Sequence, residues 1–177
     1  ATASTSFGGA YVAASAVDGN GTTRWMSLSS DPQWICVDLG ADYDIKQVKL
    51  NWAGTYIGKD YSIEVASEPD GPWTQLASIT GNTTTGLKDY SGLDGTGRYV
   101  RMYGTARAGT SYSLYEFEVY GNVAIPTIPA APSDLTATAV SQSQIDLTWT
   151  DNSTNETAFV IDRATDADFT VGLTTVT

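Results

Sequence analysis

Short segments rich in β-branched and aromatic residues recur along the first two thirds of the chain, and this pattern is the strongest constraint on its fold. Glycine, aspartate, asparagine and proline punctuate the intervals, as they do between strands. Apolar and polar residues alternate over residues 48–52 and 117–120, which is the period of a strand with one buried face. Helix signals are scarce. The sequence therefore predicts an all-β, antiparallel sandwich or jelly roll, with strands at 34–39, 45–52, 61–66, 74–79, 98–103 and 113–120.

Charge and composition restrict the function. The 177 residues carry a net charge of −11 and contain no histidine. A strongly acidic chain is repelled by nucleic acid and by anionic membranes, so we expect neither as a partner. Without histidine, serine–histidine or cysteine–histidine catalysis and imidazole zinc sites are excluded. Charged residues make up 16%, below the roughly 25% of an average soluble domain. Solubility therefore depends on Ser, Thr, Asn and Gly, which is typical of secreted, extracellular β-proteins.

The single cysteine and the apolar segments give two further expectations. Cys36 lies in the apolar run 34–39 without a basic neighbour in sequence, so we expect a small buried core residue rather than a reactive thiolate. No apolar stretch reaches the roughly 18 residues of a membrane-spanning helix, and no membrane insertion is expected. No basic-then-apolar leader is present, so Ala1 is interpreted as a mature or trimmed terminus.

After Gly121 the character of the sequence changes. Residues 125–132 hold three prolines, which predicts an extended linker over residues 123–131. Residues 1–122 contain 13 acidic and 8 basic residues, whereas 123–177 contain 7 acidic and 1 basic. Strand candidates follow at 145–149 and 158–163.

The segment 132–177 resembles the opening of a fibronectin type III domain, on the strength of residues 132–137, 145–149 and 155–163. Such domains need seven strands over about 100 residues, so we expect an incomplete domain with an open apolar face. We expect this half to be ordered by packing against a neighbour or a second copy.

The loop 15–25 is the segment richest in candidate ligands. Asp18, Asn20 and Thr23 surround Gly19 and Gly21, and their oxygens suit Ca²⁺, which takes six to eight oxygen ligands. The same residues also suit a turn stabilised by Asp18 without a metal.

Residues 1–122 resemble a coagulation-factor/discoidin-type domain of the bacterial sort, a family 32 carbohydrate-binding module. The resemblance rests on residues 16–25, 32–40, 48–52, 60–65, 71–73, 98–107 and 113–121. It implies an eight-stranded jelly roll that is not an enzyme. It also implies one structural Ca²⁺, whose ligands would be Ser15 (carbonyl), Asp18, Asn20, Thr23, Tyr115 (carbonyl) and Glu116.

Members of this family bind sugars on loops at one end of the barrel. Sugar recognition needs aromatic rings and planar polar groups. Trp25, Trp34, Trp52 and Trp73 are expected in the core, and Tyr56 and Tyr112 are the expected stacking platforms. Arg24 could donate to two hydroxyls or pair with Asp31. The candidate carbohydrate-binding residues are Phe7, Arg24, Tyr56, Lys59, Arg107 and Tyr112.

Two departures from the family pattern narrow the ligand. β-Galactoside binders usually carry a histidine, which this chain lacks. Binders of glucosamine chains tend to place glutamates where this chain has residues 7–8 and 53–54. We therefore expect a neutral polysaccharide, with a glucan favoured, and a role beside other modules of a secreted bacterial polysaccharide-degrading enzyme.

The sequence is also compatible with other functions. A galactose-type or amino-sugar module remains an alternative, as does a cell-surface adhesion module that binds glycan, protein or lipid. Catalysis by the chain itself would need paired carboxylates about 5–10 Å apart. The pairs close in sequence are Glu116/Glu118 and Asp42/Asp44, and Glu116 is better explained as a Ca²⁺ ligand.

Overall fold

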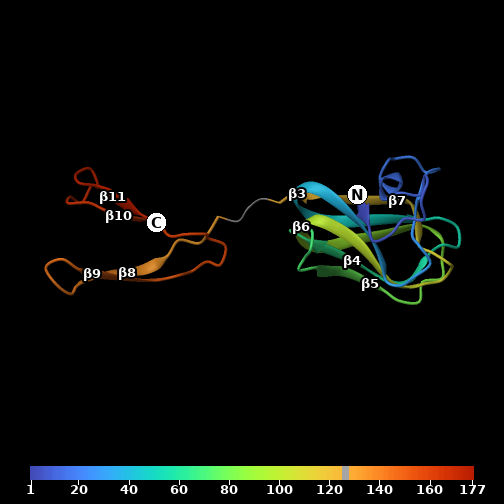
Figure 1. The fold of residues 1–177 in the computed structure, drawn as a ribbon. Coiled ribbons are helices and arrows are strands. Elements are labelled where there is room, and N and C mark those ends of the chain that lie inside the picture. Colours follow the sequence, from blue (N-terminus) through green and yellow to red (C-terminus); the bar gives the residue numbers. More distant parts are fainter. Residues whose placement is uncertain (125–127) are drawn as a thin grey trace. The chain divides into compact units, whose positions relative to one another are not determined.

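The computed structural model describes residues 1–124 and 128–177 (Figure 1). The chain divides into two compact units, residues 1–124 and 125–177. This division falls inside the predicted linker 123–131, of which Ile125, Pro126 and Thr127 lie outside the described residues. Within the described residues, no helix is long and apolar enough to cross a membrane.

The first unit is a rolled antiparallel sheet with one short 3₁₀ helix, η1 (Ala13–Ala16). Its strand order is β2-β7-β3-β6-β4-β5, and β1 pairs with β3. The strands are β1 (Thr2–Ala3), β2 (Trp25–Met26), β3 (Gln33–Trp52), β4 (Gly58–Ala66), β5 (Thr74–Ile79), β6 (Gly86–Arg107) and β7 (Ser113–Val123).

Two long strands, β3 and β6, join the two layers of the sandwich. The first half of β3 pairs with the second half of β6, from Gln33↔Gly104 to Asp38↔Tyr99. The ladder is interrupted between Asp38 and Tyr43, and the second half of β3 then pairs with both β6 and β7. The predicted strands 34–39 and 45–52 are therefore parts of one strand. The first half of β6 was not predicted, because residues 86–97 are rich in glycine and polar side chains.

The core fills the space between the layers and confirms the all-β jelly roll. Ile35, Ile63 and Met102 come from one layer, and Leu50 and Phe117 come from the other; all are buried. Alternation along the strands directs these side chains inward, as the sequence pattern indicated.

The four tryptophans expected in the core divide into two pairs. Trp25 and Trp52 are 0% and 1% exposed, and both belong to the core cluster. Trp34 and Trp73 are only half-buried, so their assignment to the core was wrong. Trp34 follows the buried Gln33 and precedes the buried Ile35, and strand alternation therefore turns it to the outer face of the sheet.

The second unit consists of two separate hairpins. One contains β8 (Ser133–Ala139) and β9 (Ile145–Thr150), and the other β10 (Ile161–Arg163) and β11 (Thr174–Val176). Of the predicted strand 158–163, only β10 forms. Large apolar side chains stay exposed on both hairpins, including Leu135 at 68% and Val176 at 63%. An apolar face is therefore open in this unit.

Cys36 is buried at 7% exposure on β3, where it pairs in register with Thr2. The sequence prediction of a buried cysteine is confirmed. Burial raises the pKa of its thiol from 9.0 to about 11, which keeps it protonated at neutral pH.

The thiol of Cys36 should react slowly in the folded protein. A pKa rise of this size lowers the thiolate fraction by about a hundredfold near pH 8. Iodoacetamide should therefore alkylate the native chain much more slowly than the chain in denaturant, as mass spectrometry would measure. Equal rates in the two states would contradict the burial of Cys36.

Gly104 on β6 should be intolerant of a side chain. A Cβ at this position would overlap the ring of Tyr112, whose side chain is fully buried. Gly104→Ala should lower the free energy of unfolding by about 1–3 kcal/mol, the usual cost of overpacking a core. Urea unfolding followed by tryptophan fluorescence measures this change. Gly21→Ala is the control, since a Cβ there meets no atom within 4 Å.

Candidate functional site

Four loops meet at one end of the first unit, and backbone hydrogen bonds hold them together. The Phe7 amide donates to the Met26 carbonyl at 2.8 Å, and the Ser27 amide donates to the Tyr112 carbonyl at 2.9 Å. The Ser113 amide donates to the Tyr56 carbonyl at 2.9 Å. The segments that begin near Phe7, Arg24, Thr55 and Arg107 therefore form one continuous surface.

The first of these loops carries two aromatic rings. Gly8 and Gly9 adopt left-handed backbone angles, with φ of 104° and 59°, in a turn closed by the Tyr11 amide and the Gly8 carbonyl. Phe7 is 57% exposed, and its ring meets the Tyr11 ring edge-on with centroids 6.2 Å apart. The turn thus presents Phe7 beside Tyr11 at the surface.

Arg24 lies against the rings of Tyr11 and Tyr56. Its guanidinium carbon is 5.1 Å from the Tyr11 centroid and 5.5 Å from the Tyr56 centroid, within cation–π range. Among the described residues, the Arg24 guanidinium has neither an ion-pair partner nor a hydrogen-bond acceptor. Arg24 therefore does not pair with Asp31, and its planar set of donors remains available. We call Phe7, Tyr11, Arg24 and Tyr56 the loop cluster.

Asp31 organises the neighbouring loop instead. Its carboxylate accepts a hydrogen bond of 2.7 Å from the Tyr112 hydroxyl and lies 3.3 Å from Nη1 of Arg107. Burial, followed by the hydrogen bond to Asp31, raises the pKa of Tyr112. The Tyr112 side chain is 0% exposed, so the prediction that it forms a stacking platform is corrected. It packs against Trp52 in the core, with ring centroids 6.5 Å apart.

The structure brings together Phe7, Arg24 and Tyr56 of the six predicted residues. Arg107 lies beside Asp31. Lys59 is exposed on β4, and no ion pair among the described residues includes it. Tyr11 was not among the six predicted residues. An aromatic residue just beyond two glycines was the available signal.

The loop 15–25, called the oxygen-rich loop below, forms a second local cluster. The Thr23 hydroxyl lies 2.7 and 2.9 Å from the two carboxylate oxygens of Asp18, and 2.8 Å from the Asn20 carbonyl. The side-chain oxygen of Asn20 instead accepts from the amide and hydroxyl of Thr22. Thus Asn20 contributes its backbone oxygen to the side where Asp18 and Thr23 meet.

Glu116 on β7 faces this loop. Its Oε1 is buried and has no hydrogen-bond partner among the described residues. Burial, followed by the negative charge of Asp18, raises the pKa of the Glu116 carboxyl. Tyr115 lies where the β3–β7 ladder is interrupted, between the pairs Asn51↔Glu116 and Trp52↔Leu114. The site thus combines two carboxylates with neutral oxygens, and one carboxylate oxygen, Oε1 of Glu116, is buried without a partner among the described residues. This set of ligands fits a Ca²⁺ ion.

Comparison with known proteins identifies the family. Residues 15–102 match the F5/F8 type C family described as a NedA-like, galactose-binding domain. A solved CBM32 domain of AlyQ, in complex with 4,5-unsaturated mannuronic acid, is 32% identical with a TM-score of 0.58. The match covers 67% of this chain and 92% of that one. The chain belongs to family 32 of the carbohydrate-binding modules.

Two further solved structures are similar to this module. Both are chitosan-binding modules of a chitosanase/glucanase from Paenibacillus sp. IK-5. Module 1 is 40% identical with a TM-score of 0.64, over 68% of this chain and 92% of that one. Module 2, solved with chitotriose, is 37% identical with a TM-score of 0.63, over 68% and 94%. No curated protein matches the chain.

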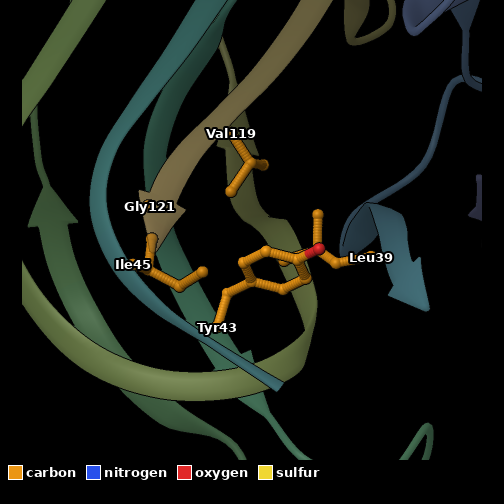
Figure 2. A pocket seen from close by; sticks show the side chains of 5 residues that line it. All are labelled: Leu39, Tyr43, Ile45, Val119 and Gly121. Atoms are coloured by element: carbon orange, nitrogen blue, oxygen red, sulfur yellow. The ribbon is translucent and has the colours of Figure 1, made fainter. Parts of the chain in front are cut away.

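The module also has a pocket of about 260 Å³ where β3 bends (Figure 2). The Tyr43 ring lies between the side chains of Leu39 and Ile45, with Val119 of β7 nearby. The side chains of the lining are apolar apart from the Tyr43 hydroxyl, and none of the six predicted carbohydrate-binding residues contributes to it. This pocket is therefore separate from the loop cluster.

Proposed function

We propose that the first unit is a non-catalytic module that binds a neutral polysaccharide, with a glucan favoured, at the loop cluster. The observation that carries this proposal is the Arg24 guanidinium, held against the rings of Tyr11 and Tyr56 without an acceptor of its own. Aromatic rings pack against the C–H face of a sugar, and a guanidinium donates to two hydroxyls at once. The exposed ring of Phe7 extends the apolar surface.

Charge supports a neutral ligand over a glucosamine chain. The unpaired cation of Arg24 at the centre of the cluster repels an ammonium group. The carboxylate of Asp31 is already engaged by Tyr112 and Arg107, and Oδ1 of Asp60 accepts the Gly81 amide at 2.7 Å. The similar chitosan-binding modules favour an amino sugar as the second candidate, and a binding screen separates the two.

We also propose a structural Ca²⁺ between the loop 15–23 and β7. Its ligands would be the carbonyls of Ser15, Asn20 and Tyr115, the carboxylates of Asp18 and Glu116, and the hydroxyl and carbonyl of Thr23. The orphaned Oε1 of Glu116 is the main support. The ion would hold the loop against the sheet, and no chemistry of sugar cleavage is assigned to it.

For the second unit we propose the first strands of a fibronectin type III domain. The hairpin β8–β9, the open apolar face and the packing of Trp149 on Phe159, with centroids 5.2 Å apart, support this. We further propose that the chain acts beside other modules of a secreted polysaccharide-degrading enzyme.

Substitution in the loop cluster should weaken binding there without unfolding the protein. Tyr56→Ala and Arg24→Ala should each weaken binding by about tenfold or more, the usual effect of losing a central aromatic or arginine anchor. Calorimetry and affinity electrophoresis with laminarin, soluble starch, galactan and chitosan would measure this. Tyr120→Ala is the matched control, since Tyr120 is a 44% exposed ring on β7 outside the cluster. Unchanged affinity in both cluster variants would reject the site, and binding of chitosan alone would reject the neutral ligand.

Calcium should stabilise the folded chain. A ligand at 100 times its Kd adds about 2.7 kcal/mol to the free energy of unfolding, so the melting temperature should fall when a chelator is added. Glu116→Gln should largely remove this difference, whereas Glu118→Gln, two residues along the same strand, should preserve it. A melting temperature indifferent to chelator in the unsubstituted chain would contradict the calcium proposal.

A further inference from the structure

The strands β3, β6 and β4 lie side by side in one layer (Figure 1). A second group of aromatic side chains lies on the outer face of this layer. Trp34 on β3 is directly opposite Tyr103 on β6, and Arg101 on β6 is opposite Glu64 on β4. The residues on either side of Tyr103 and of Arg101 are buried. Strand alternation therefore directs Trp34, Tyr103 and Arg101 away from the core.

Trp73, in the segment that precedes β5, completes this group. The Arg101 guanidinium carbon is 3.9 Å from the Trp73 ring centroid and 4.8 Å from the Tyr103 centroid. Gly71 makes this arrangement possible: its φ is 90°, and a Cβ there would lie 2.7 Å from Cδ1 of Trp73. The motif Gly71-Pro72-Trp73 thus positions a half-buried indole over the sheet. We call Trp34, Trp73, Arg101 and Tyr103 the sheet-face cluster.

The polar atoms of these rings have no protein partners. The Trp25 indole in the core donates to the Thr5 carbonyl at 2.9 Å, as a buried indole normally does. By contrast, the indole nitrogens of Trp34 and Trp73 and the Tyr103 hydroxyl make no hydrogen bond to any described residue. These three atoms are not buried, so solvent or a ligand can reach them. Each ring therefore offers an apolar surface together with a free polar group.

The two arginines on this face are each paired with a carboxylate. Arg101 contacts Oε2 of Glu64 through Nε at 2.7 Å and Nη2 at 2.6 Å, and the Ser62 hydroxyl donates to Oε1 of Glu64. Asp38 is paired with Arg98 at 2.6 Å, and that hydrogen bond lowers the pKa of Asp38 to about 2. An anionic ligand would therefore find both arginines already paired, whereas the hydroxyls of a neutral ligand can pair with the free polar groups of the rings.

The face is also continuous with the loop surface. Trp34 follows Asp31 by three residues, and Ser4, just after β1, donates its amide to the Trp34 carbonyl at 3.0 Å. We propose that the sheet-face cluster is a second saccharide-binding surface, which takes a neutral polysaccharide chain across the strands. It is distinct from the loop cluster and does not depend on it.

The test follows each tryptophan separately. The full chain contains five tryptophans, and their indole N–H signals can be assigned by NMR and titrated with laminarihexaose, maltohexaose and cellohexaose. The Trp34 and Trp73 signals should shift saturably with at least one of these probes. They should do so equally in Tyr56→Ala, which removes the loop cluster.

Variants of the sheet face complete the experiment. Trp34→Ala should weaken this binding by about tenfold, as for loss of an aromatic anchor. Trp73→Phe keeps a ring over Arg101 but loses the indole donor, and it should weaken binding less. Tyr120→Ala, on the other layer, should have no effect. Saturation of the loop cluster with unmoved Trp34 and Trp73 signals would overturn the second surface and leave the proposed function intact. Loss of the Trp34 and Trp73 shifts in Tyr56→Ala would also overturn it.

Discussion

The ladder between β3 and β6 is the interaction on which the rest of the first unit depends. Because both strands run through both layers, the bend between Asp38 and Tyr43 fixes how the layers face each other and encloses the core. The same ladder brings both ends of β3 to the loop end of the unit. Gln33, at one end, pairs with Gly104, and Trp52, at the other end, lies near Tyr112. The pairing of the strands therefore determines where the loops lie.

Burial of polar groups decides which loop residues can face a ligand. The hydroxyl of the buried Tyr112 donates to Asp31 across the loops, and the cost of burying an unpaired hydroxyl explains why it keeps this partner. Arg24 has no such partner among the residues that the structure describes, and it lies against aromatic rings. A cation that the protein leaves without an acceptor is available to bind one from outside. Arg107, at the end of β6, lies beside Asp31 instead. This difference between Arg24 and Arg107 could not be read from the sequence, because both are arginines close to glycine-containing loops.

The sequence was sufficient for the fold and for most of the oxygen-rich loop. Alternation over residues 48–52 identified an amphipathic strand, and Asp18, Asn20 and Thr23 do converge as their spacing indicated. Predictions failed where a residue's environment depends on distant partners. Trp34 and Trp73 match core residues in type but face outward, and Tyr112 follows an exposed loop but lies beneath Gly104. The residue type indicates how strongly an aromatic side chain favours burial. The strand register decides which face of the sheet that side chain occupies.

Arg24 and Arg101 both stack on aromatic rings, but the electrostatics of the two stacks differ. Arg101 contacts the carboxylate of Glu64 as well as two rings, so its charge is neutralised. A ligand on this face would therefore be bound chiefly by the neighbouring indoles and phenol. Arg24 has the rings alone, so its guanidinium itself would direct the ligand's hydroxyls. A long chain that reached both surfaces would gain through linked binding, because the second contact is then intramolecular. Two weak surfaces of different chemistry on one small domain can in this way favour a polysaccharide over its short fragments.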